Sequence, residues 1–198
     1  MPKVVDHGQR RQELVEATWR IIARHGLSGA TMRQIAAEAG FANGALKPYF
    51  PTKGELIEAT YAFVFDRTNR RVEVATRDLG GLAALEAFCR EVLPLDAERL
   101  DEARVVISFW QEAAHDPRGA DLNNASMAQW RRSMTGWMEQ ARATGELEPG
   151  VDIPGVGDVL LNFLLGSQIS AVIDRSATAP ADLERQLAAQ LERLRARR

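Results

Sequence analysis

Two short amphipathic helices joined by a glycine are predicted between Thr31 and Leu56, and this pairing constrains the fold more than any other feature. Thr31 can cap the first helix through its hydroxyl, and Gly40 can adopt the positive φ that ends it. Apolar residues recur at helical spacing on both sides of the glycine: Met32, Ile35, Ala36, Ala39, and then Ala42, Ala45, Leu46, Tyr49 and Phe50. Because each helix has to bury its apolar face, the two helices pack on each other and form a helix-turn-helix unit.

These residues resemble the DNA-binding domain of TetR-type bacterial repressors. The shared pattern is T-x-x-x-I-A-x-x-A-G-F from Thr31, followed by N-G-A-L-K-P-Y-F-P-T-K-G-E-L from Asn43. This combination is more specific than a bare helix-turn-helix pattern. The resemblance implies an all-α chain of about nine helices, with an N-terminal three-helix DNA-binding domain and a helical domain for ligand binding and dimerisation.

The second helix of the unit, residues 43–50, is the expected recognition helix. Such a helix lies in the major groove and presents its N-terminal residues to base edges. Asn43 can form two hydrogen bonds to adenine, and Lys47 can reach guanine or a phosphate. The resemblance adds phosphate contacts by Tyr49 and Lys53. The residues predicted to contact DNA are Thr31, Arg33, Asn43, Gly44, Ala45, Lys47, Tyr49 and Lys53.

Two residues depart from the family pattern within this helix. Ala42 stands where Ser or Thr is common, so the helix start lacks a side-chain cap that contributes about 1 kcal/mol. Pro48 stands where an aromatic residue or histidine is common, and it removes the hydrogen bond to the carbonyl four residues back. We therefore expect a short or bent recognition helix that reads altered bases but still binds.

A further amphipathic helix is predicted over residues 9–25, with Gly26 as its C-cap, and it completes the three-helix domain. Near its start, Arg10 and Arg11 can reach DNA phosphates or a minor groove, or can remain solvated. The whole chain has a net charge of −2, although the part up to Thr60 is mildly basic. This asymmetry supports DNA binding only weakly, because a solvated helix face gives similar counts.

The predicted domain boundary follows residue 52. Residues 1–52 form the DNA-binding domain, and residues 53–198 form the ligand-binding and dimerisation domain. In the family that the chain resembles, the helix at 53–77 is the lever between the ligand site and DNA. Turn and breaker residues separate the later predicted helices, which are 82–92, 97–115, 122–144, 155–173 and 181–194.

Aromatic residues at helical spacing in the second domain predict a small-molecule pocket. Trp faces can hold a quaternary ammonium by cation–π attraction, although each ring can also be a plain core residue. The run LPLDAERLDEARVVISFWQEAAHDP resembles the ligand domain of BetI-like, choline-responsive regulators of the TetR type. The predicted lining residues are Phe88, Phe109, Trp110, Trp130, Met134, Trp137 and the polar Asn162, to which Gln168 is an alternative.

Residues 155–173 are apolar nearly all round, yet Asp158, Asn162 and Gln168 make them a poor membrane span. Together with the leucine stripe of 181–194, they predict a homodimer with a four-helix interface; a purely intramolecular core is the alternative. A two-fold dimer would present two recognition helices about 34 Å apart to a palindromic operator.

An enzyme is not expected, because the sequence offers no convergent set of acid, base, nucleophile or metal ligands. Cys89, the only cysteine, lies in an apolar helix pattern typical of a core residue. His115 beside Asp116 suits a helix C-terminus. No cofactor or metal is expected, and the lack of an N-terminal apolar signal segment indicates the cytoplasm.

The leading hypothesis is a ligand-responsive transcriptional regulator, a repressor that a small molecule releases from a palindromic double-stranded DNA operator. The first alternative is a dimeric small-molecule-binding protein with little or no sequence-specific DNA binding. A more distant alternative is an all-helical enzyme. Neither the effector, the operator nor the choice between repression and activation can be deduced from the sequence.

Overall fold

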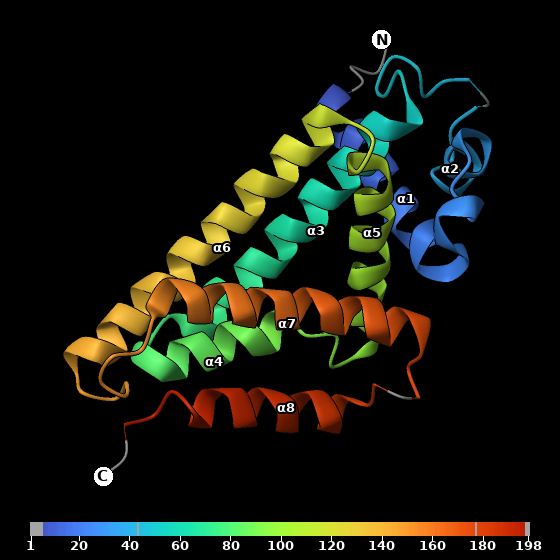
Figure 1. Cartoon of the computed structure of the whole chain (residues 1–198). Coiled ribbons are helices and arrows are strands. Elements are labelled where there is room, and N and C mark those ends of the chain that lie inside the picture. Colours follow the sequence, from blue (N-terminus) through green and yellow to red (C-terminus); the bar gives the residue numbers. More distant parts are fainter. Residues whose placement is uncertain (1–5, 43, 177, 197–198) are drawn as a thin grey trace. The chain divides into compact units, whose positions relative to one another are not determined.

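The computed structural model describes residues 6–42, 44–176 and 178–196, and within them it contains eight α-helices (Figure 1). The helices are α1 (His7–Gly29), α2 (Met32–Glu38), α3 (Lys53–Thr76), α4 (Gly81–Val92), α5 (Ala97–Ala113), α6 (Pro117–Ala143), α7 (Ile153–Ile173) and α8 (Pro180–Glu192). The described residues form no β-strand, since the bridge between Leu147 and Arg195 is isolated. The predicted all-α class is confirmed.

The chain divides into two compact units. The first comprises Met1–Asp66 and Arg104–Ala120, and the second comprises Arg67–Ala103 and Asp121–Arg198. Helices α3, α5 and α6 therefore each contribute residues to both units.

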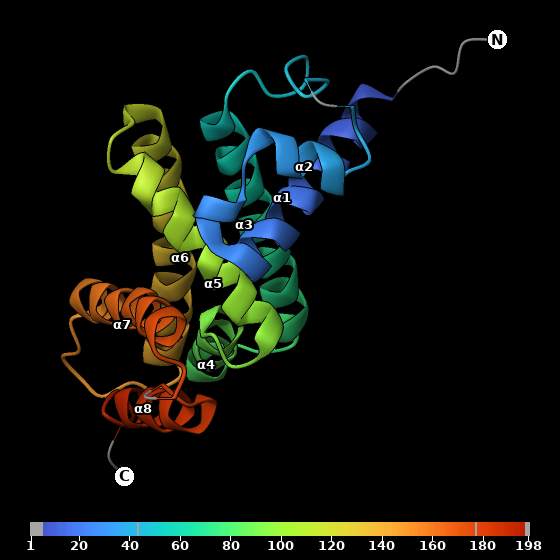
Figure 2. The same ribbon diagram turned by 90° about the vertical axis from the view of Figure 1, so that its right-hand side faces the viewer.

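Local capping explains the first two helices of the first unit, which pack against each other (Figure 2). The Asp6 carboxylate accepts from two free backbone N–H groups at the start of α1, and Gly26 interrupts α1 with a φ of 68°, at the position predicted for its end. Thr31 and Gln34 form a reciprocal capping box at the start of α2. Gly40 has the predicted positive φ, at 72°.

The core of the first unit joins α1 and α2 to parts of α3 and α5. Its buried residues are Leu14, Val15, Ala17, Ile21, Ile22, Ala30, Ile35, Ala36, Leu46, Phe50, Leu56, Val64 and Val105. Leu46 and Phe50 belong to the predicted recognition helix and are buried as expected, whereas Ala45 and Tyr49 are half-buried and Ala42 is exposed.

In the second unit, α4 packs against α8, whose leucine stripe is buried at Leu183, Leu187 and Leu191. Helix α7 buries Leu160, Leu161 and Leu164. Among the described residues, α7 is the one helix long and apolar enough to cross a membrane, a property that core helices of soluble proteins share.

Helix α6 begins earlier than predicted, at Pro117 instead of residue 122. The Asp116 carboxylate accepts a hydrogen bond from the Gly119 N–H at 3.0 Å, and proline is favoured in the first turn because its missing N–H needs no partner there. The Asp-Pro pair that the sequence suggested as a helix end therefore also starts the next helix.

Candidate functional site

The segment expected to be the recognition helix consists of turns. We call residues 42 and 44–50 the reading segment; Asn43, a predicted base contact, lies outside the described residues. The Ala45 and Tyr49 N–H groups donate to carbonyls three residues back, at 3.0 and 2.9 Å, and the Phe50 N–H donates four residues back, to Leu46 at 2.8 Å. The predicted helix over 43–50 is thus corrected to a series of turns over 44–49.

Backbone chemistry accounts for this correction. Pro48 has no N–H to donate, and it disfavours helical φ and ψ for the residue before it, Lys47. Gly44 has a φ of 87°, which lies in the left-handed region and cannot continue a right-handed helix. Pro51 imposes the same restriction on Phe50. The sequence suggested a short or bent helix from Ala42 and Pro48 and missed the contribution of Gly44.

The reading segment nevertheless has two buried apolar side chains that hold it in place and other residues that are exposed. Leu46 and Phe50 are 2% and 0% exposed. Gly44 and Lys47 are exposed, while Ala45 and Tyr49 are half-buried. Arg33 on α2 is exposed as well. The segment is anchored by its apolar side chains, while the backbone at Gly44 and the charged side chain of Lys47 are exposed. Such an arrangement is suited to contact a DNA groove.

Two other residues in the predicted DNA-contacting set make internal contacts. The Thr31 hydroxyl accepts from the Gln34 N–H at 3.2 Å. The Lys53 ammonium donates to the Leu27 carbonyl at 3.1 Å and so ties the start of α3 to the last turn of α1. The sequence offered no signal for this second contact, which joins residues 26 positions apart.

Residues at the start of α1 also contact the reading segment. The Arg11 guanidinium donates to the Tyr49 carbonyl, and its central carbon lies 4.1 Å from the Phe50 ring centroid. The His7 and Tyr49 ring centroids are 4.5 Å apart. The sequence suggests Arg11 only as a DNA contact or a solvated side chain and does not predict these intramolecular contacts.

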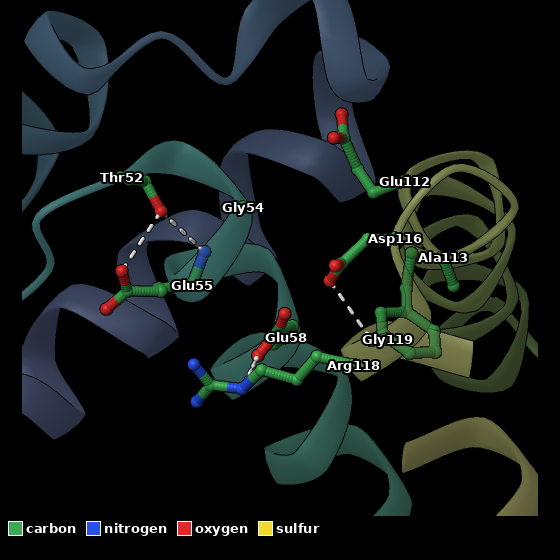
Figure 3. A pocket seen from close by; sticks show the side chains of 10 residues that line it. Thr52, Gly54, Glu55, Glu58, Glu112, Ala113, Asp116, Arg118 and Gly119 are labelled. Carbon is green, nitrogen blue, oxygen red and sulfur yellow. Dashed lines mark hydrogen bonds and ion pairs between the residues drawn. The ribbon is translucent and has the colours of Figure 1, made fainter. Parts of the chain in front are cut away.

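An acidic pocket of about 360 Å³ lies in the first unit (Figure 3). Its carboxylates are Glu55, Glu58, Glu112 and Asp116, and the remaining lining residues are Thr52, Gly54, Phe109, Ala113, Arg118 and Gly119. Arg118 is the only cation among these residues, and its Nε lies 3.4 Å from a Glu58 carboxylate oxygen. No group of three or more metal-ligating side chains is present in the described part of the chain.

The environment of Glu58 disfavours its charged form. Burial raises the pKa of the Glu58 carboxyl, the charge of Arg118 opposes that rise, and Asp116 adds to it by repulsion and hydrogen bonding. A carboxyl whose pKa is raised on folding stabilises the folded state fully below its unfolded pKa, and this contribution is lost as the pH rises through the folded pKa.

We predict that the Glu58→Gln variant gains stability relative to the parent protein as the pH rises from about 4 to about 7, by less than about 1 kcal/mol. Denaturant unfolding at several pH values measures the difference. Glu112→Gln is the matched control, because Glu112 lines the same pocket but is exposed. A difference that is constant with pH would contradict the predicted titration.

In the second unit, three predicted pocket residues form one aromatic cluster, which we call the Phe88 cluster. The Phe88 ring lies 5.6 Å from the Trp130 ring, edge to face, and 5.6 Å from the Trp137 ring. The Trp130 indole N–H donates to the Asn69 side-chain oxygen at 2.9 Å. Met134, on the helix that carries both tryptophans, is fully buried.

The other predicted pocket residues lie elsewhere. Phe109 belongs to the first unit, where it stacks on Tyr61 with ring centroids 3.9 Å apart and lines the acidic pocket. Trp110 is half-buried in the same unit. Asn162 is exposed and lines a surface hollow between α7 and α8.

Gln168 is the buried polar group of α7. It is 7% exposed, and its amide N–H donates to the Val92 carbonyl at the end of α4, at 3.0 Å. This bond fixes the orientation of the amide, because the opposite orientation would place two oxygens against each other. The amide oxygen, Oε1, has no hydrogen-bond partner among the residues that the structure describes.

A buried ion-pair network joins α3, α4 and α5 within the second unit. Arg71 donates to both Glu102 oxygens, at 2.8 and 2.7 Å, and to Glu91 at 3.0 Å. Burial alone lowers the pKa of Arg71, but the bonds and charges of the two glutamates outweigh it and raise that pKa. No sequence pattern predicts this network, because its members are distant along the chain.

Cys89 is fully buried. Burial, followed by the charge of Glu86, raises the pKa of its thiol to about 12. Since the thiolate is the reactive form, this environment disfavours nucleophilic chemistry at neutral pH. The observation agrees with the core role predicted for Cys89.

The chain matches two protein families. Residues 14–60 match the family described as bacterial regulatory proteins of the tetR family, and residues 82–196 match the C-terminal domain of BetI-type transcriptional repressors. The transcriptional regulator PksA of Bacillus subtilis is 32% identical over 142 residues, which are 71% of this chain and 69% of PksA.

Two solved structures share the fold. A transcriptional regulator from Rhodococcus sp. Rha1 is 27% identical, with a TM-score of 0.81 over 93% of this chain and 95% of that one. A regulator from Saccharomonospora viridis in complex with choline is 20% identical, with a TM-score of 0.88 over 96% of this chain and 100% of that one.

Proposed function

The chain belongs to the TetR family of bacterial transcriptional regulators, and we propose how its residues carry the family's ligand-responsive DNA binding. Regulators of this family bind DNA operators and small-molecule effectors, typically as dimers. The observation that carries the proposal is the reading segment, which exposes Gly44 and Lys47 above buried Leu46 and Phe50. The protein is a repressor that a small molecule releases from a palindromic operator.

We assign DNA binding to residues 1–52 and ligand binding with dimerisation to 53–198, with 53–77 as the connecting helix. Asn43 and Lys47 contact base edges, and Gly44 and Ala45 allow close approach to the groove. Arg33 and Tyr49 contact phosphates, while Thr31 and Lys53 hold the surrounding turns in addition to reaching the DNA backbone. The protein acts in the cytoplasm, where its operator lies.

The exposed face of α7 supports a homodimer through α7 and α8. Residues on this face recur at alternating spacings of three and four, which is the pattern of a helix seam. They are Val159, Asn162, Gly166, Ile169 and Ile173, all of which are exposed. Val159 and Ile173 are 56% and 79% exposed, and such apolar exposure along one stripe is typical of a surface that pairs with a second copy.

The Phe88 cluster supports an organic cation as the effector. Trp faces attract cations, and the solved relative from Saccharomonospora viridis is in complex with choline. Trp130 and Trp137 bind the cationic end, and the unpaired Gln168 oxygen accepts a hydrogen bond from a donor on the ligand. Of the remaining predicted lining residues, Met134 shapes the site from the helix that carries both tryptophans, whereas Phe109 and Trp110 belong to the first unit and Asn162 lines a separate surface hollow.

Selection from a randomised duplex library tests the DNA-binding part. We expect enrichment of a palindrome. The logarithm of the binding constant should fall with the logarithm of the salt concentration, with a slope of about −0.9 per phosphate contact. Salt-dependent binding without an enriched sequence would reject the repressor role in favour of a ligand-binding dimer with weak DNA binding.

A choline titration against the selected operator tests the ligand part. Linkage requires that operator weaken choline binding by the same factor by which choline weakens operator binding. We expect a factor between about 5 and 150. Unchanged operator affinity at saturating choline would exclude choline, and unchanged affinity with a panel of other organic cations would exclude the class.

We predict that Pro48→His changes which bases are selected, because it restores a backbone N–H and removes the restriction on the φ and ψ of Lys47. The affinity of the variant for its preferred site should stay within about tenfold of the parent's affinity for its own. Repeating the selection with the variant measures the preference. Pro149→Ala, in an exposed turn of the second unit, is the control for loss of a proline. Identical selected sites for parent and Pro48→His would show that Pro48 has no role in reading.

A further inference from the structure

The reading segment needs support from outside itself, because turns replace its helical hydrogen bonds. In a regular helix the backbone of such a segment would hold its own shape through bonds four residues apart. Between the described residues of the reading segment, one such bond is present, from the Phe50 N–H to the Leu46 carbonyl. The positions of Gly44 and Lys47 therefore depend on contacts made by neighbouring elements.

One side chain of α1 makes two such contacts at once. The Arg11 guanidinium donates to the Tyr49 carbonyl and stacks 4.1 Å from the centroid of the fully buried Phe50 ring. A charge-assisted hydrogen bond of this kind is stronger than a neutral one, and the cation–π contact adds to it. Arg11 thus holds the last two residues of the reading segment from a position 38 residues earlier in the chain.

Neighbouring residues extend the contact to the preceding turn. The Arg10 guanidinium carbon lies 5.1 Å from the Phe41 ring centroid, and Phe41 meets the Tyr49 ring edge to face at 5.7 Å. The His7 ring packs 4.5 Å from the Tyr49 ring. The start of α1 therefore contacts Phe41, just before the reading segment, and Tyr49 and Phe50 at its end.

We infer that Arg11 is a positioning residue that fixes the shape of the reading segment, and that it does not act as a phosphate contact. This inference rests on the proposed DNA binding. The geometry needs a planar group that donates along its edge while its face lies on a ring, which arginine provides and lysine does not. A phosphate contact needs only a positive charge, which either residue supplies.

The substitution Arg11→Lys separates the two roles, because it keeps the charge and removes the planar group. We expect it to weaken binding to the selected operator about tenfold, to leave binding to a scrambled duplex unchanged, and to leave the salt slope unchanged. In the protein without DNA, amide hydrogen exchange over residues 44–50 should become faster, while exchange in α4 and α8 stays as in the parent.

Arg24→Lys is the matched control on the same helix. The Arg24 side chain is 63% exposed, and its guanidinium lies 3.9 Å from Glu38. Operator affinity and exchange over residues 44–50 should match the parent in this variant. Arg11→Ala completes the set, since it removes charge and planar group together.

Parent-like operator affinity in Arg11→Lys, with a salt slope lowered by about one in Arg11→Ala, would overturn the inference and make Arg11 a phosphate contact. Faster exchange in Arg11→Lys together with failure of the parent to select any sequence would uphold the positioning role and reject the proposed function. Parent-like exchange and parent-like operator affinity in both Arg11 variants would reject the positioning role alone.

Discussion

Replacement of Phe88 by alanine is expected to lower the free energy of unfolding by about 3–5 kcal/mol, the largest stability loss that we predict for this chain. The Phe88 side chain is 1% exposed and contacts two tryptophan rings, each 5.6 Å away. Its removal therefore costs both the burial of a large ring and the cavity left between Trp130 and Trp137.

Denaturant unfolding followed by tryptophan fluorescence measures this loss and also reports the changed surroundings of the indoles. Phe88→Leu should cost clearly less, because it retains most of the buried volume. Leu79→Ala is the exposed control, since Leu79 is 45% exposed. A loss below about 1 kcal/mol in Phe88→Ala would mean that the cluster collapses around the deletion and is not a packed core.

Replacement of Glu102 by alanine is expected to lower the free energy of unfolding by about 2–3 kcal/mol. Glu102 is 5% exposed and binds Arg71 through both oxygens, with Arg67 3.6 Å away. Without this carboxylate, two guanidinium groups lose their shared buried partner. Arg71 keeps its bond to Glu91, which limits the loss to less than that of an isolated buried charge.

A double-mutant cycle with Glu102→Met and Arg71→Met as its two single variants isolates the interaction. The double variant Glu102→Met with Arg71→Met should recover much of the stability, because two apolar side chains can replace a buried pair. Glu98→Ala is the control, since the Glu98 side chain is 51% exposed and its loss should cost less than about 1 kcal/mol. Strict additivity of the two single losses would contradict a direct interaction.

The features that the sequence predicted well depend on neighbouring residues. The cap at Thr31 and the positive φ of Gly26 and Gly40 follow from the chemistry of single residues, and the apolar stripes identify the helices. The reading segment differs from the predicted helix because three local effects, at Gly44, Pro48 and Pro51, act together against helix formation. A periodic apolar pattern fits a helix and a series of buried turns equally well.

Contacts between distant residues could not be predicted in this way. Lys53 donates to the backbone carbonyl of Leu27, and the network around Arg71 joins charged side chains. The spacing of these partners in sequence carries no signal. Arg11 illustrates the same limit, because the sequence offered DNA or water as its partner and the structure supplies a carbonyl and a ring. Charged residues near a DNA-binding segment can therefore stabilise it through intramolecular contacts.

The way in which the first unit is assembled from the chain determines how DNA-binding specificity could be transferred from one relative to another. That unit joins Met1–Asp66 to Arg104–Ala120, so it is not one continuous stretch of chain. Tyr61 stacks on Phe109, and Val105 belongs to the same core as Phe50. A chimera that transplants only the N-terminal stretch would combine one half of a core with a foreign other half, whereas a graft that carries both segments keeps the packing intact.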